Sequence, residues 1–289
     1  MADPPKSDSL PPQGPAPRGR VGKDLLPRLI SGVVMAGVAL GLTWAGFLPF
    51  AAMILLVSCI VAWEWGRVVR GVEFDATMAA HVAAVAAAVA LVTMDLVGLA
   101  LLALLIGAIL VALLAMGHHA AVSALGVAFA GLPAVALIWL RADPNFGLLA
   151  VLYVMVIVVV TDTAAYFSGR LIGGPRLWPR ISPNKTWAGL AGAVIASAVA
   201  GFLYAQAVTG AHPERLALLG GIVAVVAQAG DLAESALKRR FGAKDASNII
   251  PGHGGVMDRI DGLVTASVFA AIFAAIINVM EPARALLQW

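Results

Sequence analysis

The stretch Leu96-Val-Gly-Leu-Ala-Leu-Leu-Ala-Leu-Leu-Ile-Gly-Ala-Ile-Leu-Val-Ala-Leu-Leu-Ala-Met116 contains no charged residue. It matches the ~20 apolar residues that a helix needs to cross the hydrocarbon core of a bilayer. The rest of the chain has a similar character: 61% of its 289 residues are hydrophobic, 12% are charged, and the mean hydropathy is +0.93. Typical soluble domains carry ~25% charged residues, so the composition predicts an integral membrane protein.

Charged residues, prolines and glycine clusters divide the chain into further apolar runs of this kind. The runs are rich in Ala, Leu and Val, and they lack the period-2 alternation of half-buried strands. Helices satisfy their backbone hydrogen bonds internally, as lipid requires, so we predict an all-α, polytopic membrane bundle of about nine transmembrane helices. The spans are expected at residues 29–47, 49–66, 76–94, 96–116, 121–140, 147–168, 187–208, 216–236 and 257–280.

The first residues of the chain have a different composition from the spans. They include six prolines before residue 20 and no apolar core of a signal peptide, so residues 1–28 are expected to form a disordered, Pro-rich cytosolic tail. Residues 29–289 are then expected to form a single membrane-embedded domain. Two large polar loops interrupt this domain, at 169–186 and 237–256.

Basic residues are distributed unevenly between the two sides of the predicted bundle. With the N-terminus in the cytosol, every basic residue of the 19 except Arg141, Arg215 and Arg284 falls on the cytosolic side. Cytosolic loops of membrane proteins carry such an excess of Lys and Arg. The pattern therefore predicts a cytosolic N-terminus and two cytosolic polar loops, and it explains the net charge of +3 without a nucleic-acid partner.

Charge is concentrated between Asp231 and Asp261, where five acids and five bases follow an apolar span. Side chains spaced i, i+3, i+4 and i+7 share one face of a helix. This spacing holds for Asp231, Glu234, Ser235 and Lys238. If the eighth span remains helical beyond Gly230, it presents a polar face at the edge of the membrane.

A second pair of acids begins the last span. Asp258 and Asp261 share a helical face there, and the helix dipole favours negative charge near a helix N-terminus. Two helix ends that carry carboxylates suit hard cations, which prefer oxygen ligands. We therefore predict that Asp231 and Asp258 bind Mg²⁺, alone or with a second cation. The alternative is a set of surface ion pairs, each of which contributes little to stability.

Glycines and bases in the same region suit phosphate. In His253-Gly254-Gly255 the glycines lack a Cβ and allow the backbone to approach phosphate oxygens. Basic side chains can stabilise charge that develops on phosphate in a transition state. We predict these roles for Lys238, Arg239 and Arg259.

Two upstream features are further candidates. Asp162 follows an apolar run, and an acid within a span is usually functional or paired; the alternative is a carboxylate satisfied by neighbouring hydroxyls and Arg170. Glu64, between two tryptophans, is open to a structural or a catalytic role. The sequence Ser182-Pro-Asn-Lys-Thr-Trp187 resembles a helix start with Ser182 as the N-cap. Such a start can bind an anion with Lys185 and Thr186, or it is ordinary capping.

Several of these motifs together resemble one enzyme family. Gly230-Asp-Leu-Ala-Glu-Ser-Ala-Leu-Lys-Arg239, Lys244-Asp245 and Pro251-Gly-His-Gly-Gly-Val-Met-Asp-Arg-Ile-Asp261 resemble the signature of the phosphatidate cytidylyltransferases, also called CDP-diacylglycerol synthases. Asp162-Thr-Ala-Ala-Tyr166 and the Ser182–Trp187 motif are similar to upstream blocks of that family. The C-terminal half carries most of the resemblance.

The resemblance implies an activity and roles for individual residues. CTP and phosphatidate would give CDP-diacylglycerol and pyrophosphate, with Mg²⁺, in a multi-span homodimer of the bacterial inner membrane whose active site faces the cytosol. Asp231 and Asp258 would be the principal metal ligands, and Asp261 and Asp162 supporting acids. The resemblance also implies that Ser235, Lys238 and Arg239 contact substrate or phosphate.

Two other functions are compatible with parts of the sequence. A cytidylyltransferase for another lipid phosphate would need the same head-group chemistry. A lipid or ion transporter also carries acids within spans, but broken helices near the middle of the membrane are typical of transporters. The acids of this chain are expected at the cytosolic ends of the spans instead.

Overall fold

The computed structural model describes residues 25–117, 119–250 and 254–289. Of the predicted tail, 1–28, residues 1–24 lie outside the described residues. Residues 25–28 are helical and belong to the first helix, which begins at Leu25. The elements in chain order are α1 (Leu25–Ala45), α2 (Phe47–Arg70), α3 (Ala76–Thr93), α4 (Val97–Leu114), α5 (Ala120–Arg141), α6 (Gly147–Leu171), β1 (Arg176–Trp178), β2 (Ser182–Thr186), α7 (Trp187–Ala205), α8 (Pro213–Arg240), α9 (Met257–Asn278) and α10 (Pro282–Leu287).

The predicted spans correspond to helices α1 to α9 in the same order. Eight of these, α2 to α9, are long and apolar enough to cross a membrane, and residues 31–45 of α1 form a shorter apolar helix. The prediction of an all-α, multi-pass membrane protein is therefore confirmed. Helix α8 extends beyond its predicted end to Arg240, so the polar face from Asp231 to Lys238 is helical. The basic residues in its last turn favour this extension because they complement the helix dipole.

The short hairpin of β1 and β2 was not predicted, and it corrects the helix start proposed at Ser182. Residues Ser182 to Thr186 form a strand, and Thr186 is the N-cap of α7. The backbone of Thr186 is extended, with φ −123° and ψ 157°, and its hydroxyl accepts a hydrogen bond of 3.0 Å from Gly189 N–H. Both Ser and Thr suit an N-cap, and pairing of β2 with β1, from Trp178–Ser182 to Arg176–Thr186, keeps residues 182–186 extended.

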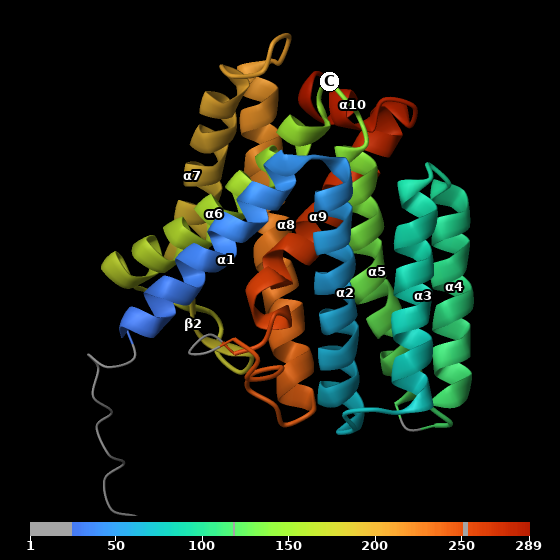
Figure 1. The fold of residues 1–289 in the computed structure, drawn as a ribbon. Helices are drawn as coiled ribbons and strands as arrows, with labels where there is room; N and C mark the ends of the chain where they lie inside the picture. The colour runs from blue at the N-terminus through green and yellow to red at the C-terminus, as the bar shows by residue number, and fades with distance from the viewer. Residues whose placement is uncertain (1–24, 118, 251–253) are drawn as a thin grey trace, which may run out of the picture.

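Small residues allow close packing between the helices. Helices α6, α7 and α8 pack together, α2 to α5 form a second group, and α9 contacts both groups (Figure 1). A Cβ added at Gly201 in α7 would lie 2.2 Å from the carbonyl oxygen of Leu216 in α8. At Gly220 in α8 it would lie 2.5 Å from the carbonyl oxygen of Ser197. Membrane helices commonly approach each other through such small residues.

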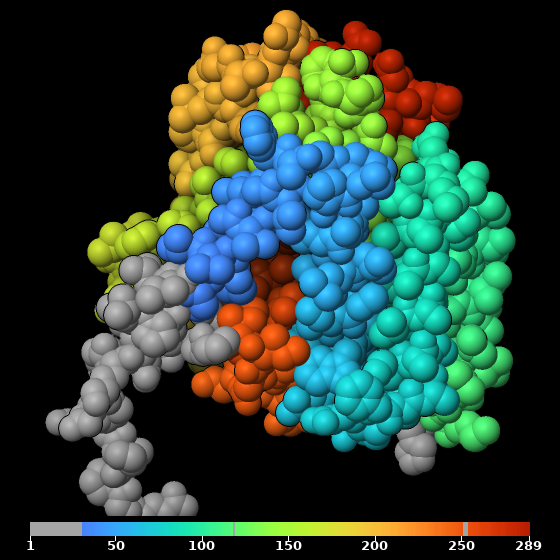
Figure 2. All heavy atoms as spheres, viewed as in Figure 1, coloured from blue at the N-terminus to red at the C-terminus, as the bar shows by residue number. Residues whose placement is uncertain are grey.

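The two polar loops lie at the same end of the bundle. Figure 1 shows β2 and the connection between α8 and α9 at the lower end, and α10 with the C-terminus at the upper end. Gly46 separates α1 from α2, and α1 packs mainly against α2. Figure 2 shows a hollow between α1 and α2 with α9 behind it. An apolar cavity of about 120 Å³ lies among α1, α2, α5, α6 and α9.

Candidate active site

Four aspartates line one cavity near the polar end of the bundle. The cavity has a volume of about 340 Å³. Asp162 comes from α6, Asp231 from α8, and Asp258 and Asp261 from the first turns of α9. Lys185 and Thr186 of β2, together with Arg259, bring basic and hydroxyl groups to the same walls. The fold thus gathers acids that are separated by up to a third of the chain.

Three of the four carboxylates are close enough to influence one another. Asp231 interacts electrostatically with both Asp162 and Asp261. Gln228 of α8 donates a hydrogen bond of 3.4 Å to Asp162, and the N–H of Gly262 donates one of 2.8 Å to Asp261. Repulsion between ionised carboxylates in a half-buried cavity raises the free energy of the site, and a bound cation offsets that repulsion.

Lys185 already supplies one such positive charge. Its Nζ atom lies 2.6 Å from Asp231 Oδ2 and donates a hydrogen bond of 3.3 Å to the carbonyl oxygen of Gln228. Ser235, one turn along α8, donates a hydrogen bond of 3.3 Å to Asp231 Oδ1. Lys185 reaches the site from strand β2, because α7 begins later than the sequence suggested.

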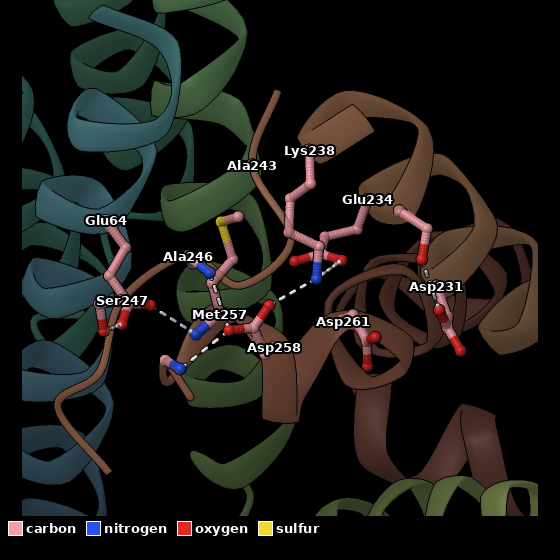
Figure 3. A network of polar contacts seen from close by, with 12 residues as sticks. Glu64, Asp231, Glu234, Lys238, Ala243, Ala246, Ser247, Met257, Asp258 and Asp261 are labelled. Carbon is pink, nitrogen blue, oxygen red and sulfur yellow. Dashed lines mark hydrogen bonds and ion pairs between the residues drawn. The ribbon is translucent and has the colours of Figure 1, made fainter. Parts of the chain in front are cut away.

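Asp258 has a different environment from Asp231, and its side chain is only 4% exposed. Its Oδ1 atom lies 2.5 Å from Lys238 Nζ, which also lies 2.6 Å from Glu234 Oε2. Its Oδ2 atom accepts hydrogen bonds from the N–H groups of Ala246 and Gly255, at 2.9 and 2.8 Å. Figure 3 shows this network, with Asp261 between Asp258 and Asp231. Oδ1 of Asp258 therefore pairs with α8, and Oδ2 holds the loop between α8 and α9.

The glycine motif takes part in the contacts of its own loop. The N–H of Gly255 donates a hydrogen bond to Asp258 Oδ2, which helps to fix the start of α9. Gly254 adopts a φ of +81°, which favours glycine, and its carbonyl oxygen accepts a hydrogen bond of 2.9 Å from Ile250. His253 lies outside the described residues.

Glu64 is a structural anchor that the sequence left undecided. Its buried carboxylate accepts hydrogen bonds from the Ser247 hydroxyl at 2.5 Å, from Val256 N–H at 2.9 Å and from Met257 N–H at 2.6 Å. These contacts join α2 to the segment that leads into α9 (Figure 3). The sequence signal was an acid between Trp63 and Trp65 within an apolar span, but its partners lie far along the chain.

The remaining candidates divide into two groups. Ser235 and Lys238 contact the aspartates from outside the cavity wall. Ser182 and Arg239 lie away from the wall: Ser182 pairs with Trp178 in the hairpin, and Arg239 is exposed and donates to the carbonyl oxygen of Ala243 at 3.4 Å. Gln228 was missed, although a buried amide in an apolar span could have indicated it.

A divalent cation would find oxygen ligands in this cavity. Within the part of the chain that the structure describes, no group of three or more His, Cys, Asp or Glu side chains is already arranged around a metal position. Four aspartates nevertheless provide the carboxylate oxygens that Mg²⁺ prefers. The donor chemistry fits a hard cation.

Known proteins resemble this chain over most of its length. Residues 26–277 match the model of the "Cytidylyltransferase family". The chain is 35% identical over 254 residues to a protein of Brucella suis biovar 1 (strain 1330) named phosphatidate cytidylyltransferase, which covers 88% of this chain and 94% of that protein. Proteins of the same name are 42% identical over 136 residues in Haemophilus influenzae and 38% identical over 140 residues in Bacillus subtilis.

The shorter matches cover 45% and 48% of this chain, and 47% and 52% of those two relatives. The match to the family model is much longer, since it extends from α1 to the end of α9 and includes every element that contributes to the acidic cavity. By the match to the family model and the identity with the Brucella protein, the chain belongs to the cytidylyltransferase family.

Proposed function

We propose that this protein transfers the cytidylyl group of CTP to phosphatidate, giving CDP-diacylglycerol and pyrophosphate for phospholipid synthesis. The observation that carries the proposal is the cavity of four aspartates with Lys185 and Arg259, at the polar end of a membrane bundle. Relatives named phosphatidate cytidylyltransferase support this substrate pair. The position also suits a reaction between a water-soluble nucleotide and a lipid.

In the proposed reaction, a phosphate oxygen of phosphatidate attacks the α-phosphorus of CTP. A new P–O bond forms there, while the bond from the α-phosphorus to the oxygen that bridges to the β-phosphorus breaks. The electron pair of that bond leaves with pyrophosphate, so no covalent enzyme intermediate is required. Phosphoryl-transfer catalysis consists mainly of positioning and charge stabilisation. Lys185 and Arg259 at the cavity wall supply positive charge for this purpose.

We propose Mg²⁺ as the cofactor, alone or with a second cation. When bound, it would neutralise charge on the phosphates and help to orient them. Asp231 and Asp258 are the ligands that the sequence suggests. Binding by Asp258 Oδ1 requires Lys238 to release it. Lys185 must likewise release Asp231 Oδ2. Among the described residues, no salt bridge joins Asp261 or Asp162 to a lysine, so these two acids are further candidate ligands.

The proposed setting is the inner membrane of a bacterium, with the N-terminus and the active site facing the cytosol. Support comes from the bacterial relatives, from the distribution of basic residues and from the position of both polar loops at one end of the bundle. A homodimer is proposed from the resemblance to the family alone. A different lipid phosphate is the second candidate substrate, because the cavity contacts would be shared.

The direct test is incubation of purified protein with labelled CTP, defined phosphatidate and Mg²⁺. We expect a labelled lipid that co-migrates with CDP-diacylglycerol, together with one pyrophosphate per lipid formed. Removal of Mg²⁺ by a chelator and the variant Asp231→Asn should each abolish the product. Parallel reactions with an isoprenoid ether lipid phosphate identify the preferred substrate. Failure of the folded protein to label any lipid phosphate would exclude the proposed function.

A further inference from the structure

A second cavity adjoins the acidic one. It has a volume of about 570 Å³ and shares Ala165, Tyr166, Asn184 and Thr186 with the acidic cavity. The rest of its lining consists of Gly169, Arg170, Gly173, Gly174 and Arg176. The described lining of this second cavity thus includes two arginines and no acid, whereas four aspartates line the acidic cavity.

The two arginines reach this arginine cavity from different elements. Arg170 lies in the last turn of α6, where its Nη1 atom donates a hydrogen bond of 2.8 Å to the hydroxyl of Tyr166. Arg176 begins β1 and donates from Nη1 to the carbonyl oxygen of Pro183. A guanidinium has five N–H donors, and each of these contacts uses one nitrogen. Both side chains are exposed at the cavity wall, and each is positioned by one hydrogen bond from its Nη1 atom.

The loop between the arginines leaves the wall open. Gly173 and Gly174 have φ values of +68° and +96°, which favour glycine. A Cβ added at either position would meet no atom within 4 Å. The backbone can therefore approach a ligand here without side chains in the way. Hairpin pairing between Arg176 and Thr186 fixes the far side of the same loop.

We infer that the arginine cavity binds the β- and γ-phosphates of CTP, which leave as pyrophosphate. The inference rests on the proposed function. Arginine forks match phosphate oxygens in geometry and charge, whereas the neighbouring acids repel a phosphate that carries no cation. A triphosphate with its α-phosphorus at the acidic cavity can extend across the shared wall into the arginine cavity. Phosphatidate has only one phosphate, which the acidic cavity accommodates at the reaction centre.

The test uses the full-length protein with Arg170→Gln and Arg176→Gln, and with Arg180→Gln as the matched control. Arg180 is an exposed residue in the turn between β1 and β2, and it lines neither cavity. We expect each cavity variant to raise the KM for CTP about tenfold, the equivalent of about 1.4 kcal/mol. Inhibition by pyrophosphate should weaken by a similar factor, while the KM for phosphatidate and the behaviour of Arg180→Gln stay at wild-type values.

A second measurement is independent of turnover. Titration of the purified protein with pyrophosphate should raise its thermal midpoint in the wild type and in Arg180→Gln, and less in the two cavity variants. A change in the KM for phosphatidate alone would assign the cavity to the lipid phosphate and overturn the inference, as would equal effects in all three variants. If the wild type makes no CDP-diacylglycerol, the proposed function fails, and the titration still decides whether the cavity binds pyrophosphate.

Discussion

The carboxylate of Glu64 accepts a hydrogen bond of 2.6 Å from the backbone N–H of Met257, which lies 193 positions later in the chain. This contact joins α2 to the first residue of α9. Asp258 is the next residue, and Asp261 follows one turn later. The position of two acids of the cavity thus depends on a residue that does not line the cavity.

Glu64→Gln is expected to loosen this anchor. An amide has one acceptor oxygen, so its NH2 group must face at least one donor among Ser247, Val256 and Met257. A buried donor left unpaired costs about 1–3 kcal/mol. We expect a lower midpoint of thermal unfolding. We also expect a lower kcat, because the first turn of α9, which carries Asp258 and Asp261, would be held less firmly.

The matched control is Glu73→Gln. Glu73 is 65% exposed in its side chain and pairs with Arg67 at 3.7 Å, and surface pairs contribute little. The midpoint of thermal unfolding and the kcat of Glu73→Gln should both remain at wild-type values. Wild-type kcat and stability in Glu64→Gln would show that the anchor is dispensable.

Asp231→Asn is expected to reduce turnover by orders of magnitude. A metal supplies several kcal/mol of charge stabilisation in such reactions, and a neutral amide offers one ligand oxygen but no negative charge. The Mg²⁺ concentration for half-maximal activity should rise in parallel, which a fold defect would not cause. Asp95→Asn is the control, because Asp95 lies in the turn between α3 and α4 with a φ of 62° that Asn also tolerates.

The roles of Asp258 and Asp261 can be distinguished by measuring stability and the Mg²⁺ concentration for half-maximal activity in each variant. Asp258→Asn should lower stability, because the carboxylate binds Lys238 and two backbone N–H groups. Asp261→Asn should change the Mg²⁺ requirement with little loss of stability. If Asp258→Asn instead changes the Mg²⁺ requirement and Asp261→Asn lowers stability, Asp231 and Asp258 would be the metal ligands.

The start of α7 can be tested by two hydroxyl deletions. Thr186→Ala removes the cap on Gly189 N–H and should cost about 1 kcal/mol of stability. Ser182→Ala should cost much less, because Ser182 lies at the far end of strand β2. Chemical denaturation in detergent, with membrane insertion checked separately, measures both. A larger loss for Ser182→Ala would favour the helix start that the sequence suggested.

The orientation can be tested by labelling single cysteines. After Cys59, the only cysteine, is replaced by Ala, cysteines placed in loops 169–186 and 237–256 should react only from the cytosol. A cysteine in the turn at 142–146, at the other end of the bundle, should react only from outside. Reversed labelling would invert the orientation and remove access of cytosolic CTP to the site.

The spans could be predicted because lipid imposes length and composition on each helix separately. Leu96 to Met116 indicates a membrane helix without knowledge of any other residue. The partners of Glu64 could not be predicted, since hydrogen bonds across so long a separation depend on the packing of α2 against the α8–α9 segment. At Ser182 the local pattern suited two helix starts, and pairing with β1 selected the later one. The four aspartates were all identified, but the engagement of Asp258 by Lys238 required the folded loop.

Gly255 restricts which substitutions the chain can accept at positions 255 and 64. A Cβ at this position would lie 2.4 Å from Glu64 Oε1 and 3.0 Å from the backbone nitrogen of Ser247. A side chain at 255 and a full-length carboxylate at 64 therefore compete for one space. We expect compensatory substitution: Gly255→Ala alone should be damaging, and shortening residue 64 in the same chain should restore part of the loss. A side chain at position 255 would then be tolerated only together with a shorter residue at position 64, in the other half of the sequence.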